Sequence, residues 1–134
     1  MRASFAVAAV VAAAALLAVP AEAKDGVRAK LDAPVRLDTA SGKTIRIAWR
    51  LVDRSGHRFG ASGIYLRVSR CGRAPLTVPA GPSGRGGYSA RVRVPRGGIR
   101  KLVVGLEGWR IMGDRTERAD AFFEFDPPLV RRCA

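Results

Sequence analysis

The sequence predicts an all-β fold, an antiparallel β-sandwich of about seven short strands in a single domain. Three observations support this prediction. Apolar and polar residues alternate with a period of two over most of the chain after residue 23, as in strands that bury one face. Clusters of glycine, proline and serine separate these runs, as turns do. The same region lacks the 3.6-residue period of an amphipathic helix.

The first half of the domain contains four alternating runs. Residues 27–31 and 35–37 come first, and Ser41-Gly42 marks the turn that follows them. The clearest predicted strand is 45–51, in which every second residue is a large apolar one. After a polar loop, residues 64–69 alternate again, and they predict the next strand.

The second half contains a loop-rich segment and three further strands. Residues 72–87 are crowded with proline and glycine, which predicts mostly loop. Residues 102–104 are continuously apolar, which predicts a central strand with both faces covered. Pro127-Pro128 is expected to end the last strand. The predicted strands are 88–94, 99–106 and 121–125, with a short edge strand at 76–78.

The alternating residues define a candidate core of ordinary size for such a domain. An immunoglobulin-like sandwich is the favoured architecture, and a small closed barrel is the alternative. The predicted core residues are Ile45, Ile47, Trp49, Leu51, Ile64, Leu66, Val68, Tyr88, Val92, Val94, Leu102, Val104, Phe123 and Phe125.

Residues 1–23 have the pattern of a cleavable export signal with its helical apolar segment. Arg2 precedes an apolar run from Ala3 to Val19, and Ala21-Glu22-Ala23 supplies the small-x-small pattern of a cleavage site. An uncut membrane anchor is the alternative, but the run is shorter than the roughly 20 residues of a spanning helix. We therefore expect a secreted or envelope protein, residues 24–134, without a transmembrane segment after cleavage.

Two cysteines, Cys71 and Cys133, belong to the exported part. In an oxidising compartment such a pair predicts a disulfide, which would close a loop of about 60 residues and stabilise the domain by up to roughly 4 kcal/mol. The alternative is that Cys133 lies on a frayed tail and pairs with nothing or with another chain.

One stretch of the sequence resembles a known type of protein. It comprises Gly86-Gly-Tyr-Ser-Ala-Arg-Val-Arg-Val-Pro95, Gly97-Gly98 and Val104-Gly-Leu-Glu-Gly-Trp109. This stretch resembles small exported actinobacterial proteins with immunoglobulin-like domains, and it is similar to the YtkA-like and FixH-like exported sandwiches. The resemblance implies a fold and an envelope location, with the matched residues forming a strand, a turn and a core aromatic. It carries over no catalytic residue.

Enzymatic and metal-binding functions find little support in the residues. His57, the only histidine, is expected to be a solvated loop residue rather than a general base. The glycine-rich segment 81–87 lacks the Lys-Ser/Thr ending of a phosphate-binding loop. Copper sites need several soft or imidazole ligands, whereas His57 and Met112 are the only histidine and methionine after residue 23. We therefore expect a non-enzymatic protein without cofactor or metal, and no specific nucleic-acid recognition.

The two tryptophans have different expected places. Trp49 is in phase with the apolar residues of strand 45–51, so it is predicted to lie in the core. Trp109 follows a glycine at a strand end. A place in the core or at its rim is favoured for it, and contact with a ligand is the alternative.

Positive charge is the feature that points to a binding function. The chain has a formal net charge of +13, and 20 of its 24 basic residues are arginine. A positive face would attract phosphate, sulfate or carboxylate polymers with strong salt dependence. Codon bias in a GC-rich genome is an equally weighted explanation of the arginine content. Candidate anion-binding residues on the outward phase of strands are Arg46, Arg50, Arg67, Arg91 and Arg93.

Two functional hypotheses follow. The first is a non-enzymatic envelope module that binds an anionic surface polymer or a protein partner through a basic face. The second, suggested by the resemblance, is an accessory domain of a membrane or metal-handling complex with a specific protein partner. The first predicts binding that salt abolishes, and the second predicts binding that survives moderate salt.

Overall fold

The computed structural model describes residues 26–84 and 86–133, so the predicted export signal lies outside the described residues. The described chain is all-β, which confirms the predicted fold class. No helix of this part is long and apolar enough to cross a membrane. The strands are β1 (Arg28–Leu31), β2 (Thr44–Val52), β3 (Ile64–Arg70), β4 (Arg73–Pro79), β5 (Gly81–Ser83), β6 (Gly87–Arg93), β7 (Ile99–Leu106), β8 (Trp109–Met112), β9 (Arg115–Arg118) and β10 (Ala121–Val130).

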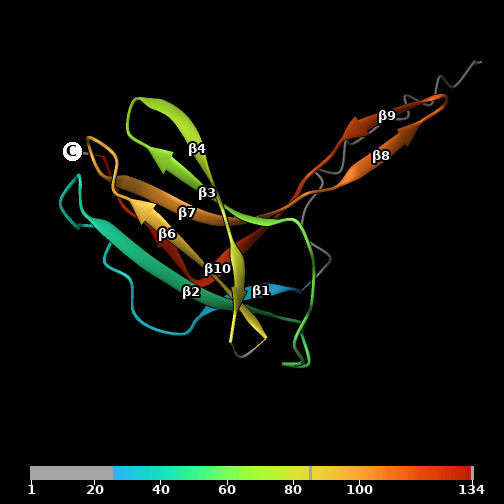
Figure 1. Cartoon of the computed structure of the whole chain (residues 1–134), viewed down its shortest axis with the longest axis horizontal. Helices are drawn as coiled ribbons and strands as arrows, with labels where there is room; N and C mark the ends of the chain where they lie inside the picture. Colours follow the sequence, from blue (N-terminus) through green and yellow to red (C-terminus); the bar gives the residue numbers. More distant parts are fainter. Residues whose placement is uncertain (1–25, 85, 134) are drawn as a thin grey trace, which may run out of the picture.

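Eight of these strands form one continuous sheet that folds into two layers (Figure 1). Their order is β4-β3-β7-β10-β1-β2-β6-β5, and the bend lies between β10 and β1. Strand β10 pairs antiparallel with β7 and parallel with β1. That parallel pair is the exception to the predicted antiparallel arrangement. On the opposite side only Ala80 separates β4 of one layer from β5 of the other. This is the strand order of an immunoglobulin domain, with β1, β2, β6 and β5 as one layer.

The core lies between the two layers, where the sequence pattern predicts it. Of the predicted core residues, all are buried except Ile45 and Tyr88, which are half-buried and pack against the core. The Tyr88 hydroxyl instead holds the loop before β3, because it exchanges hydrogen bonds with the backbone of Ala61 at 2.8 and 2.9 Å. The pattern missed Val27, Ala29, Ala90 and Ile99, which complete the core.

Three segments differ from the predicted strands. Residues 35–37 form no strand, although Val35 and Leu37 pack against the core. The predicted loop 72–87 instead contains β4 and β5, because an edge strand tolerates prolines that donate no ladder hydrogen bond. Strand β10 also continues past Pro127-Pro128, because these prolines fall in the register shift between Glu124 and Leu129, where the ladder is interrupted.

The β8–β9 hairpin was not predicted, and it leaves the sandwich altogether (Figure 1). Within the described part of the chain its strands pair only with each other, with Trp109 opposite Arg118 and Met112 opposite Arg115. Gly113 has φ +62° and begins the two-residue turn that joins them. We call the hairpin from Trp109 to Arg118 the arm.

A close packing contact on the outer face of the β3–β7 layer requires a glycine at one position. Tyr65 points outward by sequence phase, yet it is only 7% exposed. Its ring lies across Gly105 of the neighbouring strand, where a Cβ atom would come within 2.2 Å of the ring. The face also holds Phe122, whose ring centroid is 6.4 Å from that of Tyr65.

Replacing Gly105→Ala should destabilise the protein by about 1–3 kcal/mol, because the added methyl group must displace the Tyr65 ring. The matched control is Gly60→Ala, where a Cβ would meet nothing within 4 Å and φ is not positive. Urea denaturation of both variants measures the difference. Equal stability of the two variants would contradict the assigned packing.

Candidate functional site: a basic end of the sandwich

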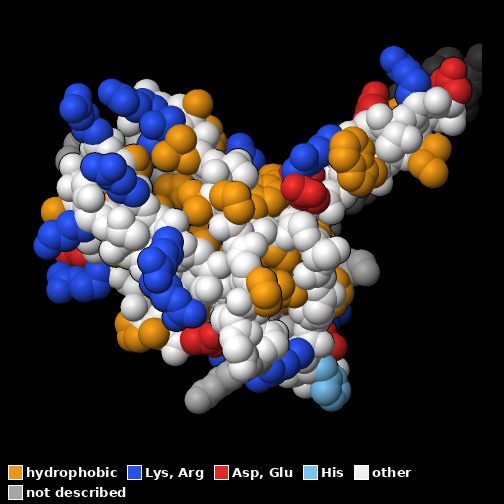
Figure 2. All heavy atoms as spheres, in the orientation of Figure 1, with side chains coloured by type: hydrophobic (Ala, Val, Ile, Leu, Met, Phe, Trp, Pro, Cys, Tyr) orange, Lys and Arg blue, Asp and Glu red, His pale blue; other side chains and the backbone are white. Residues whose placement is uncertain are grey.

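Basic residues gather at the end of the sandwich that holds the carboxyl terminus (Figures 1 and 2). Strand β6 ends there and β7 begins there, and Arg70 at the end of β3 pairs with Ile99. The backbone of Lys43 is bonded to that of Val94 at the same end. We call this surface the basic end. It consists of Lys43, Arg70, Arg73, Arg93, Arg96, Arg100, Arg131 and Arg132.

A disulfide joins two parts of this surface that are far apart in sequence. Cys71 and Cys133 are bonded, with a sequence separation of 62 and Cα atoms 5.7 Å apart. Cys71 occupies the turn between β3 and β4, next to Arg70 and near Arg73. Cys133 directly follows Arg131 and Arg132. The cross-link therefore brings two short arginine-rich segments together.

Arg131 organises the turn before β7. Its guanidinium donates hydrogen bonds to the carbonyl oxygens of Gly97 and Ile99, both at 3.2 Å. Its backbone N–H donates to the carbonyl oxygen of Arg100 at 2.6 Å. Gly98 has φ +82°, a backbone conformation that favours glycine, and a Cβ there would also lie 2.3 Å from this guanidinium, so the predicted Gly97-Gly98 turn needs its second glycine. Arg131 thus has mainly a structural role at the basic end.

The other arginines of this surface keep charges that no carboxylate neutralises. Among the described residues, no Asp or Glu forms an ion pair with any member of the basic end. Asp38 is hydrogen-bonded to Arg36 instead. That bond lowers the pKa of Asp38, and the charge of Arg131 lowers it further. Such a surface is electrostatically suited to an anion.

A hollow of about 690 Å³ lies within this surface. It is lined by Arg100, Val130, Arg131, Arg132 and Cys133. The disulfide therefore forms part of its wall. A second hollow, of about 340 Å³, contains Asp32 beside Arg50, so its charge is partly balanced.

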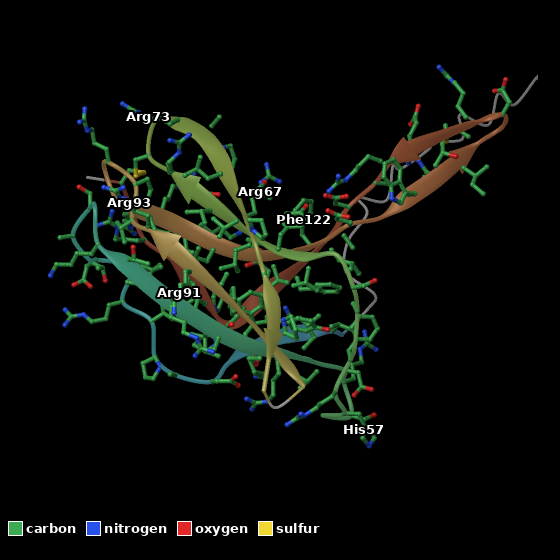
Figure 3. All side chains as sticks on the ribbon, in the orientation of Figure 1. His57, Arg67, Arg73, Arg91, Arg93 and Phe122 are labelled. Atoms are coloured by element: carbon green, nitrogen blue, oxygen red, sulfur yellow. A yellow bond between two sulfur atoms is a disulfide. The ribbon has the colours of Figure 1, made fainter. Side chains whose placement is uncertain are left out.

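The predicted anion-binding residues fall into three groups. Arg46 lies directly opposite Arg91 on the outer face of β2 and β6, and Arg93 lies next to them opposite Thr44. Arg50 is on the same face but is paired with Asp32 at 2.9 Å. Arg67 belongs to the other layer, so it lies apart from the rest (Figure 3).

The contacts of Arg67 explain its separate role. Its guanidinium carbon lies 5.2 Å from the ring centroid of Phe122, over the aromatic outer face of the β3–β7 layer. A cation stacked on an aromatic ring in this way helps to cover it. Arg67 is therefore engaged within the protein, whereas Arg91 and Arg93 lie on β6 of the other layer (Figure 3).

Most of the basic end was missed because its arginines lie in turns and at strand ends, where alternation carries no information. The sequence nevertheless contained a signal for these residues. Arg70-Cys71-Gly-Arg73 and Arg131-Arg132-Cys133 each place arginines beside a cysteine. A disulfide between these cysteines requires the two basic segments to meet.

His57 lies in the loop between β2 and β3, with its side chain 82% exposed. Its Nδ1 atom is 3.9 Å from one carboxylate oxygen of Asp53. The other carboxylate oxygen of Asp53 accepts a hydrogen bond from the backbone N–H of His57. Within the described ranges, no group of three or more His, Cys, Asp or Glu residues is arranged to hold a metal ion.

A second polar cluster fixes the root of the arm. Asp120 accepts hydrogen bonds from the Tyr65 hydroxyl, from Arg118 Nε at 2.8 Å and from the Gly108 backbone at 3.2 Å. The Arg118 bond is the main cause that lowers the pKa of Asp120 to about 2. Burial, followed by the bond to Asp120, raises the pKa of Tyr65 to about 12. We call these groups the root cluster.

Trp109 begins the arm, and it is not part of the core. Its side chain is 64% exposed, so the expectation that it packs in or around the core is wrong. Arg118 on the paired strand places its guanidinium carbon 5.9 Å from the centroid of the indole ring. The root cluster therefore also holds Trp109, because Arg118 contacts both Asp120 and the indole.

Comparison with models of known protein families finds no match, and comparison with curated protein sequences finds none either. The function therefore has to be argued from the surface of this sandwich.

Asp120→Asn should lower the pKa of Tyr65 from about 12 towards its ordinary value of 10.0, but only in part, because burial is the larger cause of the rise. The absorbance of the phenolate form during alkaline titration measures this shift. The Tyr65→Phe variant lacks the transition of Tyr65 and so distinguishes it from that of Tyr88. An unchanged transition in the Asp120→Asn variant would contradict the root cluster.

For Asp120 itself, the depressed pKa means that its stabilising contribution is lost as pH falls through about 2.

Proposed function

We propose that the protein is a non-enzymatic, exported module of the cell envelope whose basic end binds an anionic polymer. The observation that carries the proposal is the concentration of unpaired cations around one hollow, at the end opposite the arm. Export itself rests on the leader pattern of residues 1–23. The immunoglobulin-like envelope proteins that the sequence resembles are consistent with this location.

The arrangement of the positive charges destabilises the fold, which favours a functional explanation of the arginine content over composition alone. Arg46 and Arg91 are directly opposite each other on neighbouring strands, and like charges in this position destabilise a sheet. The cystine assembles more cations at the adjoining end, again without acidic partners among the described residues. An anionic ligand would neutralise both groups and convert the repulsion into binding energy.

The extent of the surface favours a polymer over a single small anion. Arg93 belongs to the basic end and is also next to Arg91 and Arg46, so the unpaired charges continue from the end onto the outer face of β2 and β6. Exposed guanidinium groups bind phosphate or carboxylate through two parallel hydrogen bonds. A chain with regularly repeated anions can contact several of these groups together, and each contact releases counterions.

Replacing Arg73, Arg100 and Arg132 by Gln should weaken binding to isolated actinobacterial cell-wall material at least tenfold at low salt. Each lost anion contact should also reduce the salt dependence, with a slope change of about one per contact. Co-sedimentation of the purified protein across a salt series measures both quantities.

The matched control replaces Arg28, Arg54 and Arg115 by Gln, which removes the same charge away from the basic end. Equal weakening by both triple variants would reduce the effect to net charge and contradict a localised site. Binding that persists at moderate salt would favour the alternative, an accessory domain with a specific protein partner.

A further inference from the structure

The arm is an exposed element with two chemically different faces. Residues opposite each other in an antiparallel pair share a face, so Trp109 and Ile111 lie with Arg118 and Thr116. The other face carries Arg110, Met112, Arg115 and Glu117. Ile111 is 80% exposed and Trp109 is 64% exposed, so the apolar face is open to solvent. Figure 2 shows hydrophobic side chains exposed on the arm.

The arm is held in place rather than loosely attached. At its base, Ala119 donates a backbone hydrogen bond to Gly108 at 2.8 Å, and a Cβ on Gly108 would lie 2.4 Å from the Ala119 carbonyl oxygen. The root cluster binds Arg118 through Asp120. A preorganised element loses little conformational entropy when it binds a surface. The protein therefore presents Trp109 and Ile111 in a fixed direction.

A second copy of this chain is a poor occupant for the apolar face. Two large side chains provide on the order of a few hundred Å² of surface, whereas stable dimers bury about 1,200 Å² or more. The net charge of +13 per chain also opposes self-association.

Insertion into the hydrocarbon of a bilayer is also unfavourable. The outer edges of β8 and β9 have unpaired backbone groups, which need water or another partner. Asp114 and Arg115 stand at the tip of the hairpin. The boundary between headgroups and acyl chains is different, because water remains there and tryptophan is favoured at this depth.

The place where the chain enters the domain gives the arm a membrane-facing direction. Strand β1 begins beside the end of β2, with Arg28 opposite Val52, and it runs parallel to β10, with Ala29 opposite Phe125 in the middle of that strand. The arm leads directly into β10. The described chain therefore begins at the end that carries the arm, and before cleavage an export segment 3–19 held in the membrane would keep that end near the bilayer.

We propose that the arm docks on a phospholipid surface, with Trp109 and Ile111 in the headgroup–acyl boundary and the Arg110–Glu117 face towards water. This contact depends on apolar burial, so it resists salt, in contrast to binding by the basic end.

The test uses phosphatidylcholine vesicles without protein at a salt concentration that suppresses electrostatic binding. The purified protein should co-sediment with them, and its tryptophan emission should shift to shorter wavelength. Trp49 is fully buried, so the shift reports on Trp109. The double substitution Trp109→Ala and Ile111→Ser should weaken co-sedimentation at least tenfold.

The matched control is Met112→Ser, which removes an apolar side chain that is 44% exposed on the other face of the arm and should leave vesicle binding unchanged. Absence of binding to these vesicles would overturn the proposal, and so would binding that the arm substitutions leave intact. Binding confined to anionic vesicles and abolished by salt would assign the contact to the basic end instead. Binding to native membranes alone that is lost after protease treatment would also overturn the proposal, because it would indicate a protein partner.

Discussion

The cross-link between Cys71 and Cys133 is the constraint on which the basic end depends. Without it, Arg131 and Arg132 would belong to a terminal segment held only by the end of β10. With it, this segment lies against the β3–β4 turn, and Arg131 reaches the carbonyl groups of the Gly97-Gly98 turn and of Ile99. The disulfide thus joins three segments that carry most of the cations of the basic end. A bond that closes so long a loop also limits the unfolded chain, which stabilises the domain.

The two ends of the sandwich have different chemistry, and the same strands connect them. Strand β7 begins at the basic end and finishes where the arm leaves, and β10 returns from the arm to the disulfide. Cations without acidic partners occupy one end, and an apolar face on a fixed hairpin projects from the other (Figure 2). The two proposed contacts, with an anionic polymer and with a lipid boundary, would lie at these opposite ends. The rigid core around Trp49 keeps the two contacts in a fixed relation.

The sequence predicts those parts of the structure whose cause is alternation. Ile47, Trp49 and Leu51 are buried because a period of two places them on one face of β2. Tyr65 has the opposite phase and is buried for a tertiary reason, the absence of a side chain at Gly105. The arm was missed because its residues are exposed on both faces, although Gly113-Asp114 between two short runs was a usable hairpin signal. For the candidate site, strand phase identified Arg46, Arg91 and Arg93 on the outer face of β2 and β6, and it carried no information about the arginines in turns.

The most direct test of the central claim is removal of the cross-link by the double substitution Cys71→Ser and Cys133→Ser. Binding of this variant to cell-wall material at low salt is compared with that of the oxidised protein, and buried-type emission from Trp49 confirms that the core is intact. We expect weaker binding with a smaller salt dependence, because Arg131 and Arg132 are no longer held beside Arg70 and Arg73. Unchanged affinity and salt dependence in a folded variant would contradict the account, because the basic end would then not be the binding surface.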